Sequence, residues 1–418
     1  MLQTAPVSAL AGRVLLAALL CATMVGLRAE PPHTAAQQAA PSGAARTITL
    51  GALFTMTEVA DPDTQAALTI AVEDVNRYLA ESGSGATLSV QREGTGMQPS
   101  AALDGLRRLA AAGVKVVVGP ETSGELAAIR DEAQRSGMVV ISHCSTAPSL
   151  AIPGDSIFRL VPDDTRQAEA IADLLERSGA RAAVQLWRDD VFGIDLSDAT
   201  RRALARRGIV TYDGAALAPD AANLNGAVAN LTAEVEAAVA AYGADRVAVQ
   251  ASIFGPDVGP VFAAALAQPA LTQVRWVGSD GTAQSAELLE DPVAAGFAVR
   301  VGGFPNPLFA GADSPKTAQI AARVTALAGR APQVCALAAY DAVWLAALTA
   351  LATGGTDDSA AFARTFPQTA DHYYGATGWT ALNAAGDREA AEYAIWAVAE
   401  RDGAFIWQQA GRIAVEAR

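Results

Sequence analysis

From residue 48 onward, short apolar runs alternate with segments in which apolar side chains recur every three or four positions. The short runs predict buried strands, and the longer recurrences predict amphipathic helices. Strands are expected at residues 48–54, 87–92, 114–118, 139–142, 182–187, 246–250, 274–278 and 297–301. Helices are expected from about residue 64 to the glycines at 83 and 85, and at 101–112, 123–136, 165–178, 197–207, 223–242, 258–267 and 314–328.

This alternation predicts the fold class and the edge at which a ligand would bind. Strands that alternate with helical crossovers form parallel sheets covered by helices on both faces, so the predicted fold is α/β. In such sheets, ligands bind outside the carboxyl ends of the strands. The candidate binding segments therefore follow strands directly, at 54–58, 119–124, 142–146, 188–193, 252–255 and 278–281.

The first 45 residues have a different character. Arg13 precedes an apolar run at 14–27 and small residues follow, which is typical of a secretory signal peptide over 1–29. Residues 30–45 are rich in Ala, Pro, Gln, Ser and Gly and predict a flexible tether. Two alternatives are open: an uncleaved anchor, and a lipid attached at Cys21. We expect a periplasmic or otherwise extracytoplasmic protein, secreted or tethered to a membrane.

Composition narrows the function classes. The chain has 418 residues, of which 51% are hydrophobic, and a formal net charge of −14. The length allows two or three domains, and the apolar fraction excludes intrinsic disorder. The acidic balance argues against nucleic acid or an anionic membrane surface as the partner. Three cysteines and three histidines form no disulfide scaffold, CxxC zinc pattern or His-rich site, so we expect no metal and no cofactor.

Enzyme motifs are missing from the places where their chemistry needs them. The chain has no phosphate-binding GxxxxGK[ST] loop and no HExxH. Ser123 lies at a strand-to-helix turn, but Glu121 occupies the first glycine position of a GxSxG elbow. His143 and Cys144 are adjacent, and neighbouring side chains on an extended segment point to opposite sides. We therefore expect a protein that is not an enzyme.

A series of short motifs runs through the predicted strand ends. They lie at 48–54 with 71–76, 116–123, 140–150, 157–164, 189–193, 276–281, 339–343, 375–378 and 386–388. Together they resemble the type 1 periplasmic binding proteins, in particular the branched-chain amino-acid-binding, or Leu/Ile/Val-binding-like, family of ABC transporters. Each motif is short, but their order and spacing extend over residues 46–408.

The resemblance implies two doubly wound parallel-sheet lobes joined by three crossovers, the first at 162–164. Lobe 1 would hold 46–163 and 303–385, and lobe 2 would hold 165–301 and 390–410. A small amino-acid-like ligand would bind in the cleft, and the lobes would close around it like a hinge. The implied partner is the permease of an ABC importer, and the protein would be a monomer. A ligand-sensing module for a separate receptor and an exported enzyme on the same scaffold are the alternatives.

Two hydroxyl residues could hold a ligand carboxylate. Ser123 and Thr146 lie beside backbone N–H groups, and Ser123 opens a helix whose positive end favours an anion. The family uses the matching positions for a carboxylate, while the alternative is that Ser123 is only a helix N-cap. Cys144 matches a position whose backbone carbonyl accepts from the ligand amino group, a role that any residue type could fill.

Three further residues are candidates on the second lobe. Asp280 lies just past a strand end, where the resemblance places an acidic partner for the ligand amino group. Phe192 matches a position that is often Tyr and could pack on the ligand. Phe254 could form a second aromatic cover, with core packing as the alternative for both rings.

The sequence also departs from well-known branched-chain binders. Residues 93–97 contain no cysteine, so the small disulfide of those relatives is absent, and whether Cys144 and Cys335 pair is open. The loop near 56–60 carries Met56 and Glu58 where the relatives have a glycine-rich run. Glu58 would disfavour an acidic ligand side chain and suit a cationic or amide one, so the identity of the ligand is open.

Overall fold

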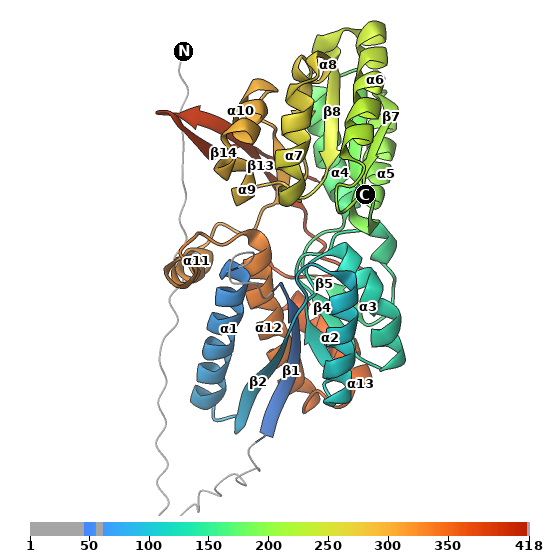
Figure 1. The fold of residues 1–418 in the computed structure, drawn as a ribbon. Helices are drawn as coiled ribbons and strands as arrows, with labels where there is room; N and C mark the ends of the chain where they lie inside the picture. The colour runs from blue at the N-terminus through green and yellow to red at the C-terminus, as the bar shows by residue number, and fades with distance from the viewer. Residues whose placement is uncertain (1–45, 56–61, 416–418) are drawn as a thin grey trace, which may run out of the picture. The chain divides into compact units, whose positions relative to one another are not determined.

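The computed structural model describes residues 46–55 and 62–415. Two parallel sheets run through it (Figure 1). The first has the order β2-β1-β3-β4-β5 and contains β1 (Arg46–Phe54), β2 (Ala86–Gly94), β3 (Val116–Val118), β4 (Val139–Ser142) and β5 (Ile157–Arg159). The second has the order β7-β6-β8-β9 and contains β6 (Ala182–Arg188), β7 (Val210–Leu217), β8 (Val247–Ser252) and β9 (Arg275–Val277). The predicted α/β class, with two doubly wound lobes, is confirmed.

Helices cover both faces of the first sheet because successive strand residues point to opposite sides. Leu50 and Ala52 of β1 pack in the core of one face, and Leu53 packs in the core of the other. The first face holds α1 (Pro62–Glu81), α11 (Pro315–Ala328), α12 (Val334–Thr353) and α13 (Ser359–Asp371), and the second holds α2 (Pro99–Ala111) and α3 (Ser123–Arg135). At Gly51 an added Cβ would lie 2.8 Å from Leu109 Cδ1, so a larger residue would force this side chain of α2 to move.

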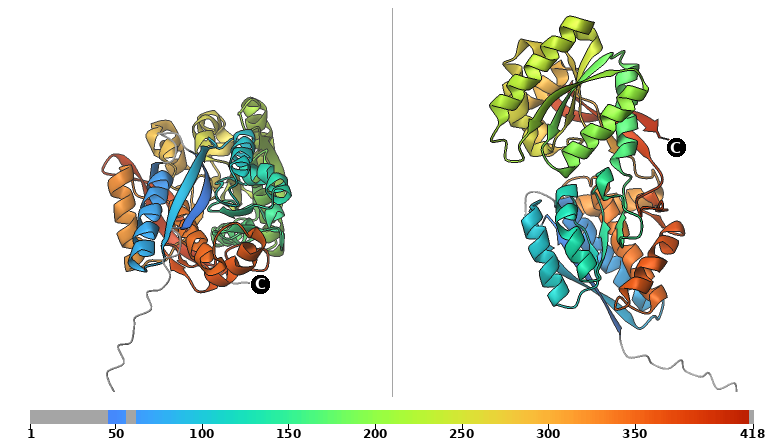
Figure 2. Two further views of the ribbon diagram at one scale, coloured as in Figure 1. Left: turned by 90° about the horizontal axis from the view of Figure 1, so that it is seen from below. Right: turned by 90° about the vertical axis from the view of Figure 1, so that its right-hand side faces the viewer.

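The second sheet is covered in the same way (Figure 2). Val184 of β6 and Val249 of β8 pack on one face, and Ala183 and Ala248 pack on the other. One face holds α6 (Leu224–Tyr242), α7 (Gly255–Leu266) and α10 (Pro292–Arg300), and the other holds α4 (Asp164–Arg177) and α5 (Val191–Arg206). Two short helices, α8 (Pro269–Thr272) and α9 (Ala286–Glu290), connect these elements.

A third sheet is antiparallel, which the alternation of strands and helices does not predict. It has the order β10-β13-β14, from β10 (Asn306–Phe309), β13 (Glu392–Arg401) and β14 (Ala404–Ala414). Asp402 and Gly403 join the last two strands, both with positive φ (54° and 77°), as a two-residue type I′ hairpin turn requires. A second small hairpin pairs β11 (Tyr374–Gly375) with β12 (Gly378–Trp379).

One predicted strand is wrong. Residues 297–301 lie at the end of α10 and just beyond it, not in a strand. Asp291 caps this helix by accepting from the N–H groups of Val293 and Ala294. A short apolar run fits a buried helix as well as a buried strand, so its pattern cannot separate the two. The other predicted strands and helices are present, with ends shifted by several residues at most in the strands and up to six at the start of α5.

The helix α12 is long and apolar enough to span a membrane by length and composition, yet 83% of that apolar window is buried in the structure. Its central carboxylate, Asp341, accepts from the backbone N–H groups of Ala376 (2.6 Å) and Thr377 (2.8 Å). It is therefore a core helix of the first sheet. The signal peptide and tether predicted for 1–45 lie outside the described residues, and the predicted lobe boundaries and three crossovers along the chain stay predictions.

Candidate functional site

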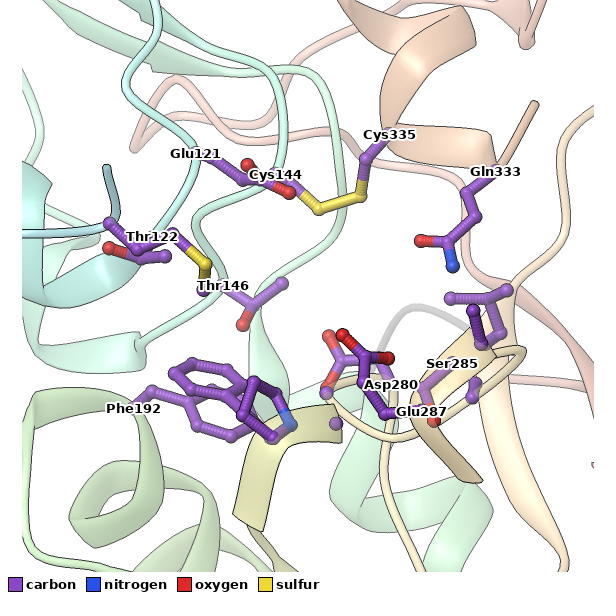
Figure 3. A pocket seen from close by; sticks show the side chains of 18 of the residues that line it. Glu121, Thr122, Cys144, Thr146, Phe192, Asp280, Ser285, Glu287, Gln333 and Cys335 are labelled. Atoms are coloured by element: carbon purple, nitrogen blue, oxygen red, sulfur yellow. A yellow bond between two sulfur atoms is a disulfide. The ribbon is translucent and has the colours of Figure 1, made fainter. Parts of the chain in front are cut away.

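A pocket of about 220 Å³ lies at the carboxyl ends of strands from both parallel sheets. The structure brings all six residues predicted from the sequence into its wall: Ser123, Cys144, Thr146, Phe192, Phe254 and Asp280. Figure 3 shows a disulfide on one side of this pocket and Asp280 and Phe192 on the other. The position of the pocket therefore follows the rule for strand ends in parallel sheets.

Ser123 organises the loop that follows β4. The helix N-cap is Thr122 and not Ser123, because the Thr122 hydroxyl accepts from the backbone N–H of Glu125 in a reciprocal capping box. The Ser123 Oγ accepts from the backbone N–H groups of Thr146 (3.2 Å) and Ala147 (3.1 Å). It also lies 3.1 Å from Ser145 Oγ. The interpretation of Ser123 as the N-cap is thus wrong by one residue.

Asp280 belongs to a buried polar network that sequence reasoning missed. The Thr146 hydroxyl donates to Asp164 Oδ2 (2.8 Å), and Gln167 Nε2 donates to Asp164 Oδ1 (2.6 Å). Gln167 Oε1 in turn accepts from the Asp280 backbone N–H (2.9 Å). Gln167 therefore joins the two acidic residues into one network at the wall of the pocket.

Burial changes the proton affinity of both acids. It raises the pKa of Asp280 to about 6. Burial also raises the pKa of Asp164 well above its ordinary value, and the neighbouring charge of Asp280 adds to the shift. Asp280 Oδ1 is shielded from solvent and has no hydrogen-bond partner in the structure. Neither carboxyl forms an ion pair with another described residue, although the charge of Arg159 acts on Asp164 from a distance.

The aromatic wall is held by an ion-pair network. The rings of Phe192 and Phe254 stack with centroids 4.8 Å apart. The Arg188 guanidinium lies 5.1 Å from the Phe254 ring centroid and donates to both carboxylate oxygens of Asp257, at 2.8 and 2.9 Å. A Cβ added at Gly281 would lie only 2.8 Å from Phe254, so glycine is needed beside the rings.

Cys144 and Cys335 form a disulfide, which answers the question that the sequence leaves open. Their Cα atoms are 5.3 Å apart and 191 residues separate them in the chain. His143 points elsewhere: it is buried, its ring centroid is 4.9 Å from that of Phe54, and burial lowers its pKa to about 3. Cys144 and His143 therefore do not form a nucleophile pair.

Further polar residues line the pocket that sequence reasoning did not assign to a ligand. Glu121 follows β3, Glu287 comes from α9, and Gln333 precedes α12, with Arg330 nearby. Gln333 Nε2 donates to the backbone oxygen of Gln284 (3.3 Å). The sequence signal for Glu121 was its place directly after a strand; Glu287 and Gln333 follow no strand end. Met56 and Glu58 lie outside the described residues.

Comparison with known proteins identifies a family and several related proteins. The model of the family described as receptor family ligand binding region matches residues 63–401. An uncharacterised protein of Methanocaldococcus jannaschii is 28% identical over 370 residues, which cover 82% of this chain and 83% of that protein. BasB of Halobacterium salinarum, the substrate-binding protein of a chemotactic signal transduction system, is 31% identical over 179 residues, or 38% of this chain and 43% of that protein.

A solved structure shares the fold. The leucine-binding protein LivK of Thermotoga maritima superposes with a TM-score of 0.71 at 16% identity, covering 88% of this chain and 99% of that chain. At this level of identity the likeness concerns the fold: parallel sheets with helices on both faces and a pocket at the strand ends.

Proposed function

Because the chain belongs to the receptor ligand-binding family and has the fold of the Leu/Ile/Val-binding type I periplasmic binding proteins, we propose that it is the extracytoplasmic solute-binding component of an ABC importer. Its ligand is an amino acid or a similar small polar compound that carries an ammonium group. The lobes close around this ligand, and the closed form delivers it to the permease. The protein works as a monomer that is exported to the periplasm or an equivalent compartment.

The observation that carries this proposal is the unpartnered carboxylate oxygen of Asp280 in the wall of a pocket with an aromatic side. Asp280 Oδ1 is shielded from solvent without a hydrogen bond, while Phe192 and Phe254 stack beside it. An ammonium group would satisfy the carboxylate through a charge-assisted bond that excludes water, and the rings would cover an apolar side chain. The backbone carbonyl of Cys144 supplies a further acceptor for the ammonium group.

The pocket supports binding rather than catalysis. His143 is buried away from it, and both Cys144 and Cys335 are held in the disulfide. The disulfide also agrees with an oxidising compartment outside the cytoplasm. We therefore propose that the protein is not an enzyme.

A second candidate function is ligand sensing for a separate receptor. The similarity to the chemotactic substrate-binding protein BasB favours it, although that match covers 38% of this chain. Both functions use the same pocket, and they differ in the protein that recognises the closed form. Pull-down with the ligand-bound protein separates them, since a permease would be captured in the first case and a receptor in the second.

Isothermal titration calorimetry on residues 46–418 tests the binding function. Amino acids, amides and small amines are titrated, and at least one is expected to bind. Asp280→Asn should weaken that binding by about 2–5 kcal/mol, because the desolvated ammonium loses its charged partner. Asp213→Asn, an exposed acid outside the pocket, is the control and should change affinity little. A folded protein that binds none of these compounds would refute the proposal.

A further inference from the structure

The charge around the pocket is unbalanced toward the negative. Asp280 and Glu287 both line it, while Arg330 is the cation among the described lining residues. Arg330 forms a salt bridge with Asp63: its Nε donates to Asp63 Oδ1 at 2.8 Å, and a second guanidinium nitrogen donates to the same oxygen. The pocket therefore presents carboxylates that a positive ligand would balance.

The partial positive charge at the N-terminus of α3, which would attract a ligand carboxylate, is already balanced by acidic side chains of the protein. Glu125 is buried in the first turn of α3, and its Oε2 accepts from the backbone N–H (3.0 Å) and the hydroxyl (2.8 Å) of Thr122. Glu121 lies immediately before this turn and accepts from the Thr55 hydroxyl (3.3 Å). An anion at this helix N-terminus would lie beside two carboxylates, which opposes the attraction of the helix end.

The hydrogen-bond donors of the loop after β4 are also engaged. The backbone N–H groups of Thr146 and Ala147 both donate to Ser123 Oγ. The Thr146 hydroxyl donates to Asp164. A ligand carboxylate bound by these donors would have to break their buried bonds and leave Ser123 Oγ or Asp164 without a donor, which is costly.

The side of the pocket formed by Asp280 and backed by Asp164 has carboxyl groups without an ion-pair partner among the described residues. Asp164 is fully buried, and its two oxygens accept from the neutral groups of Thr146 and Gln167. Asp280 Oδ1 has no hydrogen-bond partner in the part of the chain that the structure describes. Two carboxyls in a low-dielectric environment repel one another unless a proton or a cation lies near them. This side is thus built to receive a positive charge.

We infer that the pocket selects small primary amines that carry a net positive charge and lack an α-carboxylate, with Asp280 as the direct partner of the ammonium group and Asp164 as a positioning residue behind it. The inference rests on the proposed binding function and narrows its ligand class. It replaces the carboxylate role that the sequence suggested for Ser123 and Thr146 with a role inside the protein.

Matched pairs of compounds test this selectivity by calorimetry. The pairs are 3-methylbutylamine with leucine, 1,5-diaminopentane with lysine, and 1,4-diaminobutane with ornithine. In each pair the two compounds share a side chain and differ by the α-carboxylate. At least one amine should bind about tenfold or more tightly than its amino acid. The α-carboxylate of the amino acid must disrupt the hydrogen bonds at Ser123 and lie near the carboxylates of Glu121 and Glu125.

A gain of amino-acid binding is the sharper test. Glu125→Gln keeps the capping box, because glutamine can make the same reciprocal bond, but it removes one carboxylate from the helix end. The amine-to-amino-acid affinity ratio should then fall by about threefold or more. Asp164→Asn should weaken amine binding by about tenfold, whereas its neighbour Asp163→Asn, which retains a side-chain oxygen for the helix cap, should not.

The outcomes separate this inference from the proposed function. Tighter binding of an amino acid than of its matched amine would overturn the amine selectivity and leave the binding function intact. An unchanged ratio in Glu125→Gln, with the variant folded, would also overturn it. If neither amines nor amino acids bind to the folded protein, the proposed function fails together with the inference.

Discussion

At the scale of single residues, Asp280 links ligand binding to stability. Because burial raises its pKa to about 6, the folded state favours the protonated carboxyl. Its contribution to stability is fully present below the pKa of the unfolded chain, near 4, and is lost as the pH rises through about 6. The ligand-free protein therefore keeps a destabilising charge at neutral pH.

We predict that Asp280→Asn stabilises the ligand-free protein at pH 7.5 by roughly 1–3 kcal/mol and has little effect at pH 4.5. The free energy of unfolding in urea, measured at both pH values, checks this. His143 acts in the opposite direction, since its lowered pKa removes stability as the pH falls, so the comparison is made between wild type and variant at each pH. Equal effects at the two pH values would contradict the assignment.

The sequence predicted part of this site and missed part of it. Phe254 and Asp280 follow strands directly, so their type and position were enough to nominate them. Asp164 and Gln167 lie in the first turn of a helix, where acids are expected as caps. Their closeness to Asp280 depends on how α4 packs. Gln167 and Asp280 are 113 residues apart in the chain, so no local sequence pattern predicts their contact.

At the scale of elements, a buried ion pair fastens the end of β5. Arg159 Nη2 donates to Asp387 Oδ2 at 2.7 Å, and both side chains are almost completely buried. Asp387→Asn should lower the free energy of unfolding by about 3–5 kcal/mol, because the Arg159 charge is then buried without its partner. The exposed pair of Arg412 and Glu392 gives the contrast, and Glu392→Gln should cost less than about 1 kcal/mol. Denaturant unfolding of both variants measures these losses. Similar losses of unfolding free energy in the two variants would contradict the role of burial.

The disulfide fastens the loop after β4 to the first turn of α12. It closes a loop of 191 residues, so breaking it should destabilise the protein by about 2–5 kcal/mol. We predict this loss for the double variant Cys144→Ala and Cys335→Ala, together with weaker ligand binding, because both residues line the pocket. Adding a reductant should lower the stability of the wild type and leave the double variant unchanged. A reductant effect of similar size in both proteins would exclude the disulfide as its cause.

Elements were predicted best where their pattern is unambiguous. The long helix α1 and the parallel strands β3 and β4 follow from apolar spacing. The helix α10 was mistaken for a strand because its apolar run is short, although Asp291-Pro292 is a helix-start signal. The antiparallel pairing of β13 and β14 could not be predicted from the alternation of strands and helices. The sequence signal for it is Asp402-Gly403, a dipeptide that favours a two-residue hairpin turn.

At the scale of the whole molecule, the alternation of strands and helices was sufficient for the fold class, while the order of motifs was needed for the family. The identity of the ligand could not follow from either, because it depends on which donors and acceptors remain free after folding. Ser123 illustrates this: its residue type suggests a ligand contact, and its hydroxyl is used within the protein.

Ligand binding should also make the whole protein more compact. Asp280 belongs to the loop after β9 of the second sheet. Cys144, whose backbone carbonyl is the second acceptor proposed for the ammonium group, belongs to the loop after β4 of the first sheet, so one ligand that contacts both groups stabilises their closer approach. We predict a smaller radius of gyration in small-angle X-ray scattering when a binding amine is added at saturation. Asp280→Asn at the same amine concentration is the control and should keep the ligand-free value, because it binds too weakly to be occupied. A wild-type radius that does not change at a concentration where calorimetry shows full occupancy would mean that binding occurs without hinge closure, and that a permease or receptor must recognise the ligand-bound protein by some other change.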